Sequence, residues 1–352
     1  MSLCSGDGAQ DRTIHGRFRK DARFAQRLKY APSAQTQGPA VVQFPAGAAT
    51  PASIVDALNA LAGQPPRVRS RGRASFAEGR CVRGTYIPSD RAAEITRSQS
   101  FTKPSRVLAR FSVSGGDSKV ADTDGGVLRG FSFRLGGEDH RSDMLLQSAP
   151  VHFARTLDQM LAYLKARMPG PSGKPNMKKV KAFSAANPET LHQANYIAAL
   201  PLPGSFAGTT YWGVHAFPAT SSKGETRFIK FKVAPVGGDV TLTGDQARAK
   251  SADFLYDDLK NRIAKGDVRL NVMALLDRPD DPVMDVTIRW PDEDARETVW
   301  LGTIVITGVE ADEACDASIF NPATLAEGIA HPPDEIFAAR RAAYVISLGR
   351  RR

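Results

Sequence analysis

Arg340 and Tyr344, near the end of the chain, have the residue types and the spacing to hold a metal-bound cofactor. Residues at positions i and i+4 lie on one face of a helix, so the guanidinium can lie beside the phenol. A permanent cation and a metal both favour the ionised phenolate, the form in which tyrosine binds haem iron. Because this spacing is common, the pair alone does not establish a haem site.

A C-terminal helix would have to position this pair. The Pro332-Pro333-Asp334 corner supplies proline and aspartate where a helix start favours them. The segment resembles the one with which haem catalases hold iron from the proximal side. The matching residues are Asn321, Pro322, Gly328, Ile329, Asp334, Arg340, Tyr344 and Arg351. The resemblance implies that Tyr344 is the axial iron ligand, that Arg340 hydrogen-bonds it, and that Arg351 binds a haem propionate.

A second block of catalase-like sequence precedes this segment. Its motifs lie at 73–79, 84–86, 109–112, 115–116, 124, 129–134, 143–150 and 153, and residues 208–217 resemble the shorter catalase-related peroxidases. The resemblance runs from about residue 71 to residue 351. It implies that Arg73 and Arg110 bind the haem propionates, which need charge-assisted partners in a partly buried pocket. Ser112 falls where a distal serine hydrogen-bonds the family's catalytic histidine, and Phe153 falls among the phenylalanines that line the pocket.

Two positions depart from the family pattern. Phe76 stands where the family has its distal histidine, and Gln147 replaces the distal asparagine. Peroxide cleavage by ferric haem needs a group that moves a proton between the two oxygens, which imidazole can do and phenylalanine cannot. Glutamine can only donate a hydrogen bond to a bound oxygen. Because proton-transfer groups contribute about 100- to 10,000-fold, we predict much weaker catalase activity than that of ordinary catalases.

His152 offers a replacement for the missing imidazole. It stands two residues after Pro150, where the family usually has phenylalanine, so the imidazole and the aromatic ring would have exchanged sides of the pocket. The alternative is a histidine at a strand end without a part in the chemistry, and both interpretations stay open here. The other histidines have no paired metal spacing and are expected at the surface or in the core; they lie at positions 15, 140, 192, 215 and 331.

The periodicity of apolar residues predicts an α+β fold. Strands are expected at 81–87, 107–112, 127–135, 144–146, 211–217, 226–233, 268–274, 284–290 and 299–309, and helices at 52–62, 156–167 and 245–264. Aromatic or β-branched residues alternate with polar ones on both sides of 221–224, which predicts a hairpin. At least eight strands with interspersed helices favour an antiparallel β-barrel with surrounding helices over a doubly wound parallel sheet.

The remaining segments set the expected domain organisation. Residues 1–51 lack apolar periodicity and predict an extended N-terminal arm, which leaves 52–352 as a single haem-binding barrel domain. Residues 170–187 are basic and contain prolines, as in a mobile linker. Cys4, Cys81 and Cys315 have no C-x-x-C spacing and are expected to be free thiols.

Composition excludes several classes of protein. The chain has 352 residues, 42% of them hydrophobic and 24% charged, as in an ordinary globular protein. Its net charge is +10, but no nucleic-acid-binding module is recognisable, so no nucleic-acid partner is expected. No membrane span or secretory signal is visible, so a cytoplasmic location is expected, with the periplasm open if a leader was removed. The family resemblance makes a homo-oligomer the expectation.

These residues together predict a haem b protein that acts on small peroxides. A peroxidase for hydrogen peroxide or organic hydroperoxides is the main interpretation, and an apolar side that includes Phe76 would suit a bulky organic hydroperoxide. One alternative is hydroperoxide rearrangement of the allene-oxide-synthase type. A second is a non-catalytic haem-binding or ligand-sensing module, and a third is a barrel without haem.

Overall fold

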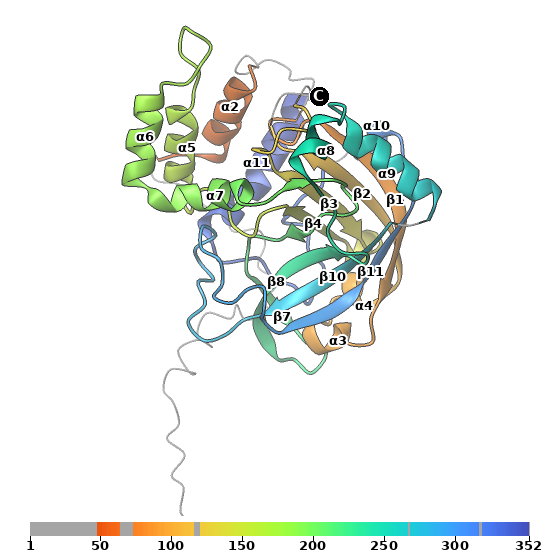
Figure 1. Cartoon of the computed structure of the whole chain (residues 1–352). Coiled ribbons are helices and arrows are strands. Elements are labelled where there is room, and N and C mark those ends of the chain that lie inside the picture. The colour runs from red at the N-terminus through yellow and green to blue at the C-terminus, as the bar shows by residue number, and fades with distance from the viewer. Residues whose placement is uncertain (1–47, 64–72, 116–119, 267, 317–318, 352) are drawn as a thin grey trace, which may run out of the picture. The chain divides into compact units, whose positions relative to one another are not determined.

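An antiparallel sheet of nine strands dominates the computed structural model, which describes residues 48–63, 73–115, 120–266, 268–316 and 319–351 (Figure 1). Its order is β10-β11-β1-β2-β3-β4-β6-β8-β7, and a further pairing of β8 with β10 closes eight of the strands into a barrel. The predicted barrel is therefore confirmed. The strands are β1 (Gly79–Pro88), β2 (Ser105–Val113), β3 (Arg129–Leu135), β4 (Ser142–Gln147), β6 (Tyr211–Trp212), β7 (Phe217–Thr220), β8 (Thr226–Pro235), β10 (Arg269–Leu276) and β11 (Thr298–Val309).

Side chains along each barrel strand alternate between the interior and the outer face of the barrel. Phe111 of β2 and Phe131 of β3 point inward, and their rings stack with centroids 4.5 Å apart. Such rings fill the barrel, so its interior is a packed core and not a ligand site. The intervening residues point outward because successive side chains of a strand face opposite sides. The outer face of β2 to β4 thus carries Arg110, Ser112 and Gly130, with Gln147 at its edge.

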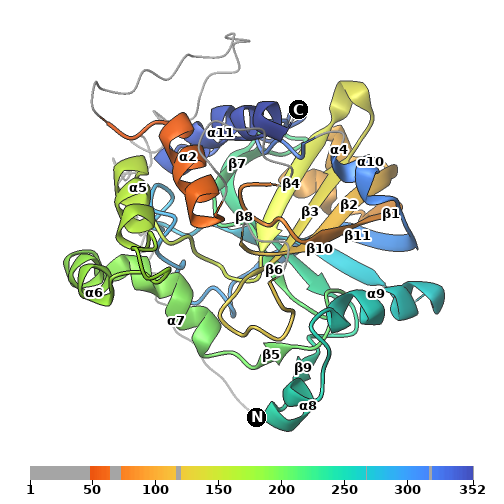
Figure 2. The same ribbon diagram turned by 90° about the horizontal axis from the view of Figure 1, so that it is seen from above.

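A layer of helices covers this outer face (Figures 1 and 2). Helix α2 (Pro51–Leu61) lies between α5 (Leu157–Ala166) and α11 (Glu335–Arg351), and the three share an apolar cluster. Thr50 caps α2 in a capping box with Ser53, which fixes where that helix begins. The other elements are α3 (Ala92–Ile95), α4 (Gln99–Thr102), η2 (Glu138–His140), α6 (Met177–Ala186), η3 (Pro188–Leu191), α7 (His192–Ala198), α8 (Gly244–Arg248), α9 (Phe254–Ala264), α10 (Asp312–Asp316), and a small sheet of β5 (Leu202–Pro203) and β9 (Thr241–Leu242).

Four predicted elements differ in the structure. The strand predicted at 211–217 is two short strands, β6 and β7, because residues 213–216 face only residues 230–231 of β8 and cannot all pair with it. Residues 284–290 are irregular, because the Asp285 carboxylate accepts hydrogen bonds from the Thr287 amide and hydroxyl, and such local bonds compete with a strand. The helix predicted at 245–264 is divided into α8 and α9, since the Ala252 carbonyl between them bonds to the Asp122 amide. The linker predicted at 170–187 contains α6, which begins where Asn176 accepts bonds from the next turn.

The prediction of free thiols is wrong for two of the three cysteines. Cys81 of β1 and Cys315 of α10 form a disulfide, with their Cα atoms 5.8 Å apart. They are separated by 234 residues in the sequence. Only the packing of α10 on β1 brings them together, so sequence spacing could not reveal the pair.

Two further expectations concern the ends and the surface of the chain. Cys4 and residues 1–47 of the predicted arm lie outside the described residues. Among the helices that are described, none has the length and hydropathy to cross a membrane.

Candidate functional site

A cavity of about 460 Å³ lies between the outer face of β2 to β4 and the helices α2, α5 and α11. Every candidate site residue from the sequence lines it. These residues are Arg73, Phe76, Arg110, Ser112, Gln147, His152, Phe153, Arg340, Tyr344 and Arg351. The structure thus gathers residues spread over most of the chain, while the role of each stays a prediction.

One wall of the cavity carries a chain of four hydrogen-bonded side chains. Arg340 Nη2 donates to Tyr344 Oη at 3.0 Å, and Arg340 Nη1 contacts His215 Nε2 at 2.9 Å. Arginine is only a donor, so Nε2 of His215 must accept, and the ring proton lies on Nδ1. Nδ1 then donates to Asp334 Oδ2 at 2.8 Å. The chain therefore fixes one neutral tautomer of His215.

Burial supports the same protonation states. His215 and Asp334 have exposed fractions of 2% and 0%. Burial lowers the pKa of His215 and outweighs the opposing effect of Asp334. Burial acts to raise the pKa of Asp334, but the His215 contact, the Phe337 amide and the Arg340 charge together hold it below its usual value. A carboxylate and a neutral imidazole result, both poised to hold the Arg340 guanidinium in place.

Local sequence explains most of this series of hydrogen-bonded side chains. Asp334 Oδ1 accepts from the Phe337 amide at 2.8 Å, so the residue that binds His215 also caps α11. Arg340 and Tyr344 are one turn apart on that helix. His215 comes from the break between β6 and β7, and the sequence did not indicate its part. Its partner Asp334 is 119 residues away, a distance over which spacing carries no signal.

The barrel wall around Phe76 has a different character. Phe76 has a φ of 52°, which is strained for a bulky residue. Arg110 holds this turn by donating to the Phe76 carbonyl at 2.9 Å and the Ala77 carbonyl at 2.8 Å. A Cβ on Gly130 would lie 2.8 Å from the Phe76 ring and 2.7 Å from Ser112 Oγ, so only glycine fits under the ring. Arg110 thus has a structural part that the sequence did not predict.

Polar groups beside Phe76 are few or already bonded. Gln147 Nε2 donates to the Val151 carbonyl at 2.8 Å and to the Ala149 carbonyl at 3.4 Å. Ser112 Oγ contacts the Gly130 carbonyl at 3.5 Å, a long contact. Among the described residues, no Asp or Glu lines the cavity. This wall therefore offers no group at Phe76 that can take up a proton.

Arginines gather along one edge of the cavity. Arg73 Nη2 donates to the Cys315 carbonyl at 2.9 Å and to Asp316 at 3.0 Å, and Asp316 lies 3.9 Å from Arg351. Nε of Arg73 is buried without a hydrogen-bond partner among the described residues. Burial, with the nearby Arg73 cation, lowers the pKa of Arg110 to about 10. Three arginines therefore line this edge, and Asp316 lies between two of them.

Comparison with known proteins identifies the family of this chain. The model of the family described as Catalase matches residues 58–351. The chain belongs to the catalase family. It is 30% identical over 319 residues to a catalase-related peroxidase of Synechococcus elongatus, covering 89% of this chain and 92% of that relative. A second catalase-related peroxidase, from Mycolicibacterium paratuberculosis, is 29% identical over 86% of this chain and 95% of its own.

Solved structures confirm the catalase fold. Catalase A of Saccharomyces cerevisiae superposes with a TM-score of 0.71 at 21% identity, over 80% of this chain. The match covers 61% of the yeast chain, so this chain spans about three fifths of that catalase. Family membership implies a haem cofactor and supports a protein that acts on peroxide.

The catalase-family cavity has the donors that a haem needs. A phenol beside a guanidinium suits ferric iron, and an aromatic wall suits a porphyrin face. The arginines of this edge and the buried Nε of Arg73 suit two propionates. The residues present therefore fit a haem.

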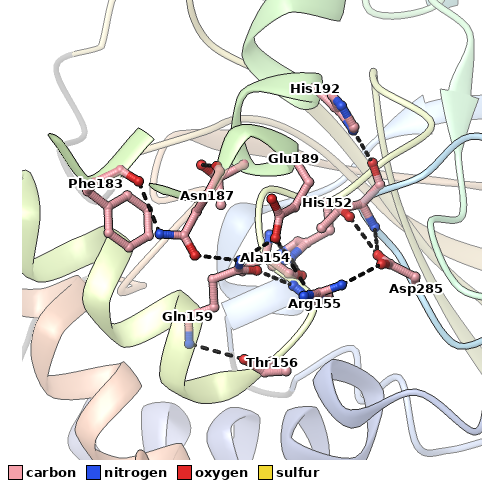
Figure 3. Close-up of polar contacts among 12 residues, drawn as sticks. His152, Ala154, Arg155, Thr156, Gln159, Phe183, Asn187, Glu189, His192 and Asp285 are labelled. Atoms are coloured by element: carbon pink, nitrogen blue, oxygen red, sulfur yellow. Dashed lines mark hydrogen bonds and ion pairs between the residues drawn. The ribbon is translucent and has the colours of Figure 1, made fainter. Parts of the chain in front are cut away.

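His152 enters the same cavity from the turn before α5. Its backbone amide donates to the Val286 carbonyl at 2.7 Å. The next residues are fixed as well, because Arg155 lies 3.6 Å from Asp285 and 3.8 Å from Glu189 (Figure 3). The irregular segment at 284–290 thus supports the wall that carries His152.

Proposed function

We propose that this chain is a haem b peroxidase that reduces hydrogen peroxide or organic hydroperoxides with electrons from a second substrate, and that its catalase activity is weak. The observation that carries the proposal is one cavity with the Arg340–Tyr344 pair on its α11 wall and Phe76 on its barrel wall. The α11 wall can hold ferric haem. The barrel wall lacks a proton carrier at the position where the catalase pattern has one.

Each wall has a separate part in the reaction. Haem, when bound, would supply the iron at which the peroxide O–O bond is cleaved, and the electrons for that cleavage. Arg340 stabilises the Tyr344 phenolate by charge and hydrogen bonding, and the His215–Asp334 pair keeps the guanidinium in place. Arg73, Arg110 and Arg351 pair with the propionates. Phe76 excludes water and offers an apolar surface to the substrate.

The overall reaction balances with a one-electron donor such as a phenol. One organic hydroperoxide and two phenols give one alcohol, one water and two phenoxyl radicals. The apolar residues on the cavity wall favour a hydroperoxide with an organic group over hydrogen peroxide. Among them are Ile54, Leu58, Phe153, Leu157, Met160 and Leu164.

Two assays on haem-loaded protein test the proposal. Oxygen evolution from hydrogen peroxide should be far below that of an ordinary catalase, while a phenol should be oxidised in step with loss of cumene hydroperoxide. Vigorous oxygen evolution would contradict the weak-catalase part. A fatty-acid hydroperoxide converted to an isomer without donor oxidation would establish rearrangement, and no loss of any peroxide would establish a sensing module.

The cellular location also follows as a proposal. The sequence favoured the cytoplasm, where thiols are kept reduced, whereas the Cys81–Cys315 disulfide favours an oxidising compartment. We therefore propose the periplasm or another oxidising space. The homo-oligomer stays a prediction.

A further inference from the structure

Few groups on the cavity wall can take up a proton near neutral pH. No carboxylate is among its described residues, and arginine stays protonated. The imidazoles are His152 and His215. Both ring nitrogens of His215 are already bonded, to Asp334 and to Arg340. His152 is left as the imidazole with a nitrogen to spare.

The contacts of His152 set its tautomer. Nδ1 lies 2.8 Å from the Ala154 carbonyl oxygen and 3.2 Å from the Ala154 amide nitrogen. The shorter contact assigns the ring proton to Nδ1, which donates to the carbonyl. Nε2 has no hydrogen-bond partner among the described residues, and it is not sealed in the protein. Because His152 lines the cavity, this lone pair is open to a molecule bound there.

Burial keeps this ring neutral. Burial is the largest effect and lowers the pKa of His152 to about 4. Arg340 and His215 act in the same direction, while the Ala154 carbonyl and Asp334 oppose them. Nε2 is therefore unprotonated at neutral pH. Once it gains a proton, the imidazolium is a strong enough acid to give that proton away again.

The ring is also held rigidly. It packs against the Phe153 ring with centroids 4.3 Å apart, and Phe153 in turn packs against the Tyr163 ring with centroids 4.5 Å apart. The backbone is anchored at Val286 and at Arg155, as Figure 3 shows for the latter. Rigid placement lowers the cost of positioning a group for proton transfer.

We propose that Nε2 of His152 carries the peroxide proton in this protein, in place of an imidazole at position 76. The inference rests on the proposed peroxidase function. Nε2 accepts the proton from the inner oxygen of the hydroperoxide and returns it to the outer oxygen. The electron pair of the O–O bond leaves with that outer oxygen, which departs as an alcohol, or as water from hydrogen peroxide. Haem would supply the two electrons, and two phenols would restore them, one electron each.

Cyanide binding tests this without turnover. Hydrogen cyanide binds ferric haem as the anion, so a base must accept its proton. His152→Phe should slow cyanide association by on the order of 100-fold, with equal haem content, and peroxide consumption should slow by a similar factor. His140→Gln is the control and should change neither, because His140 is exposed on η2 and does not line the cavity.

Chemical rescue separates proton transfer from packing. In His152→Gly, added imidazole should restore much of the cyanide association rate, whereas benzene of similar shape should not. Unchanged rates in His152→Phe, or rescue by benzene, would overturn the inference. If the wild-type haem protein binds cyanide but consumes no peroxide, the proposed function is wrong. The cyanide association rates of the variants still test proton transfer by His152 in that case.

Discussion

The α11 wall and the barrel wall of the cavity differ in the hydrogen-bond partners of their polar side chains. On the α11 wall, Asp334, His215, Arg340 and Tyr344 bond in sequence, each through a defined atom. On the barrel wall, a strained Phe76 lies over Gly130, and Arg110 is bonded to backbone carbonyls beneath it. The difference shows that holding a haem and moving a proton are separable properties of this cavity.

Removing the Tyr344 phenol should have the largest effect of the changes to the α11 wall. Loss of a group that only supports a metal ligand lowers metal affinity or activity by about 10- to 100-fold. Because Tyr344→Phe removes the proposed ligand itself, peroxide turnover should fall by more than about 100-fold. Tyr163→Phe is the control, because Tyr163 lines the same cavity without joining the hydrogen-bonded chain. Turnover and haem content should be measured together. Equal activity in Tyr344→Phe and wild type would refute the ligand assignment.

Phe76→His would make the barrel wall resemble the ordinary catalase pattern. A histidine there gains a proton-transfer role, so oxygen evolution from hydrogen peroxide should rise by on the order of 100-fold. Phe76→Leu keeps the site apolar and should leave oxygen evolution low. A rise in both variants would mean that the phenylalanine acts by blocking access and not by lacking a proton carrier.

Asp334→Asn should loosen the α11 wall while keeping its shape. The change removes a charged, buried partner of His215 and weakens the cap of α11, so the free energy of unfolding should fall by about 2 kcal/mol. Haem affinity should fall with it, because Arg340 loses its support. Asp245→Asn, at an exposed site on α8, is the control in urea unfolding and haem titration. No loss in either measurement would show that the chain of bonds does not hold the wall together.

Acid should destabilise the haem-free protein through its two cavity histidines. Burial lowers the pKa of His152 and of His215, so the unfolded chain binds more protons below about pH 6.5, and stability falls from there toward the lower folded values. Between pH 7 and pH 5 this costs roughly 2 kcal/mol for His152, whose folded pKa is about 4. Asp334, with its lowered pKa, contributes stability that is lost only below this window. Urea unfolding of His152→Phe should show a smaller acid loss than wild type, and an identical loss would contradict the burial of a neutral ring.

Sequence patterns predicted the elements better than the contacts between them. Alternation predicted most of the strands and the hairpin, but not the irregular segment at 284–290 or the break at 213–216. The Arg340–Tyr344 spacing predicted one helical face. Phe76 was found because a motif defined its position. The His215–Asp334 bond, the Arg110 clamp and the Cys81–Cys315 disulfide each join segments far apart in the chain. No local pattern encodes such contacts, so only the folded structure could show them.

Resonance Raman spectroscopy of the haem-loaded protein can detect whether the Tyr344 phenolate is bound to the iron. We expect iron–phenolate vibrations that disappear in Tyr344→Phe and persist in Tyr163→Phe. A haem bound without phenolate bands, or with imidazole bands that disappear when His152 or His215 is replaced, would contradict this expectation.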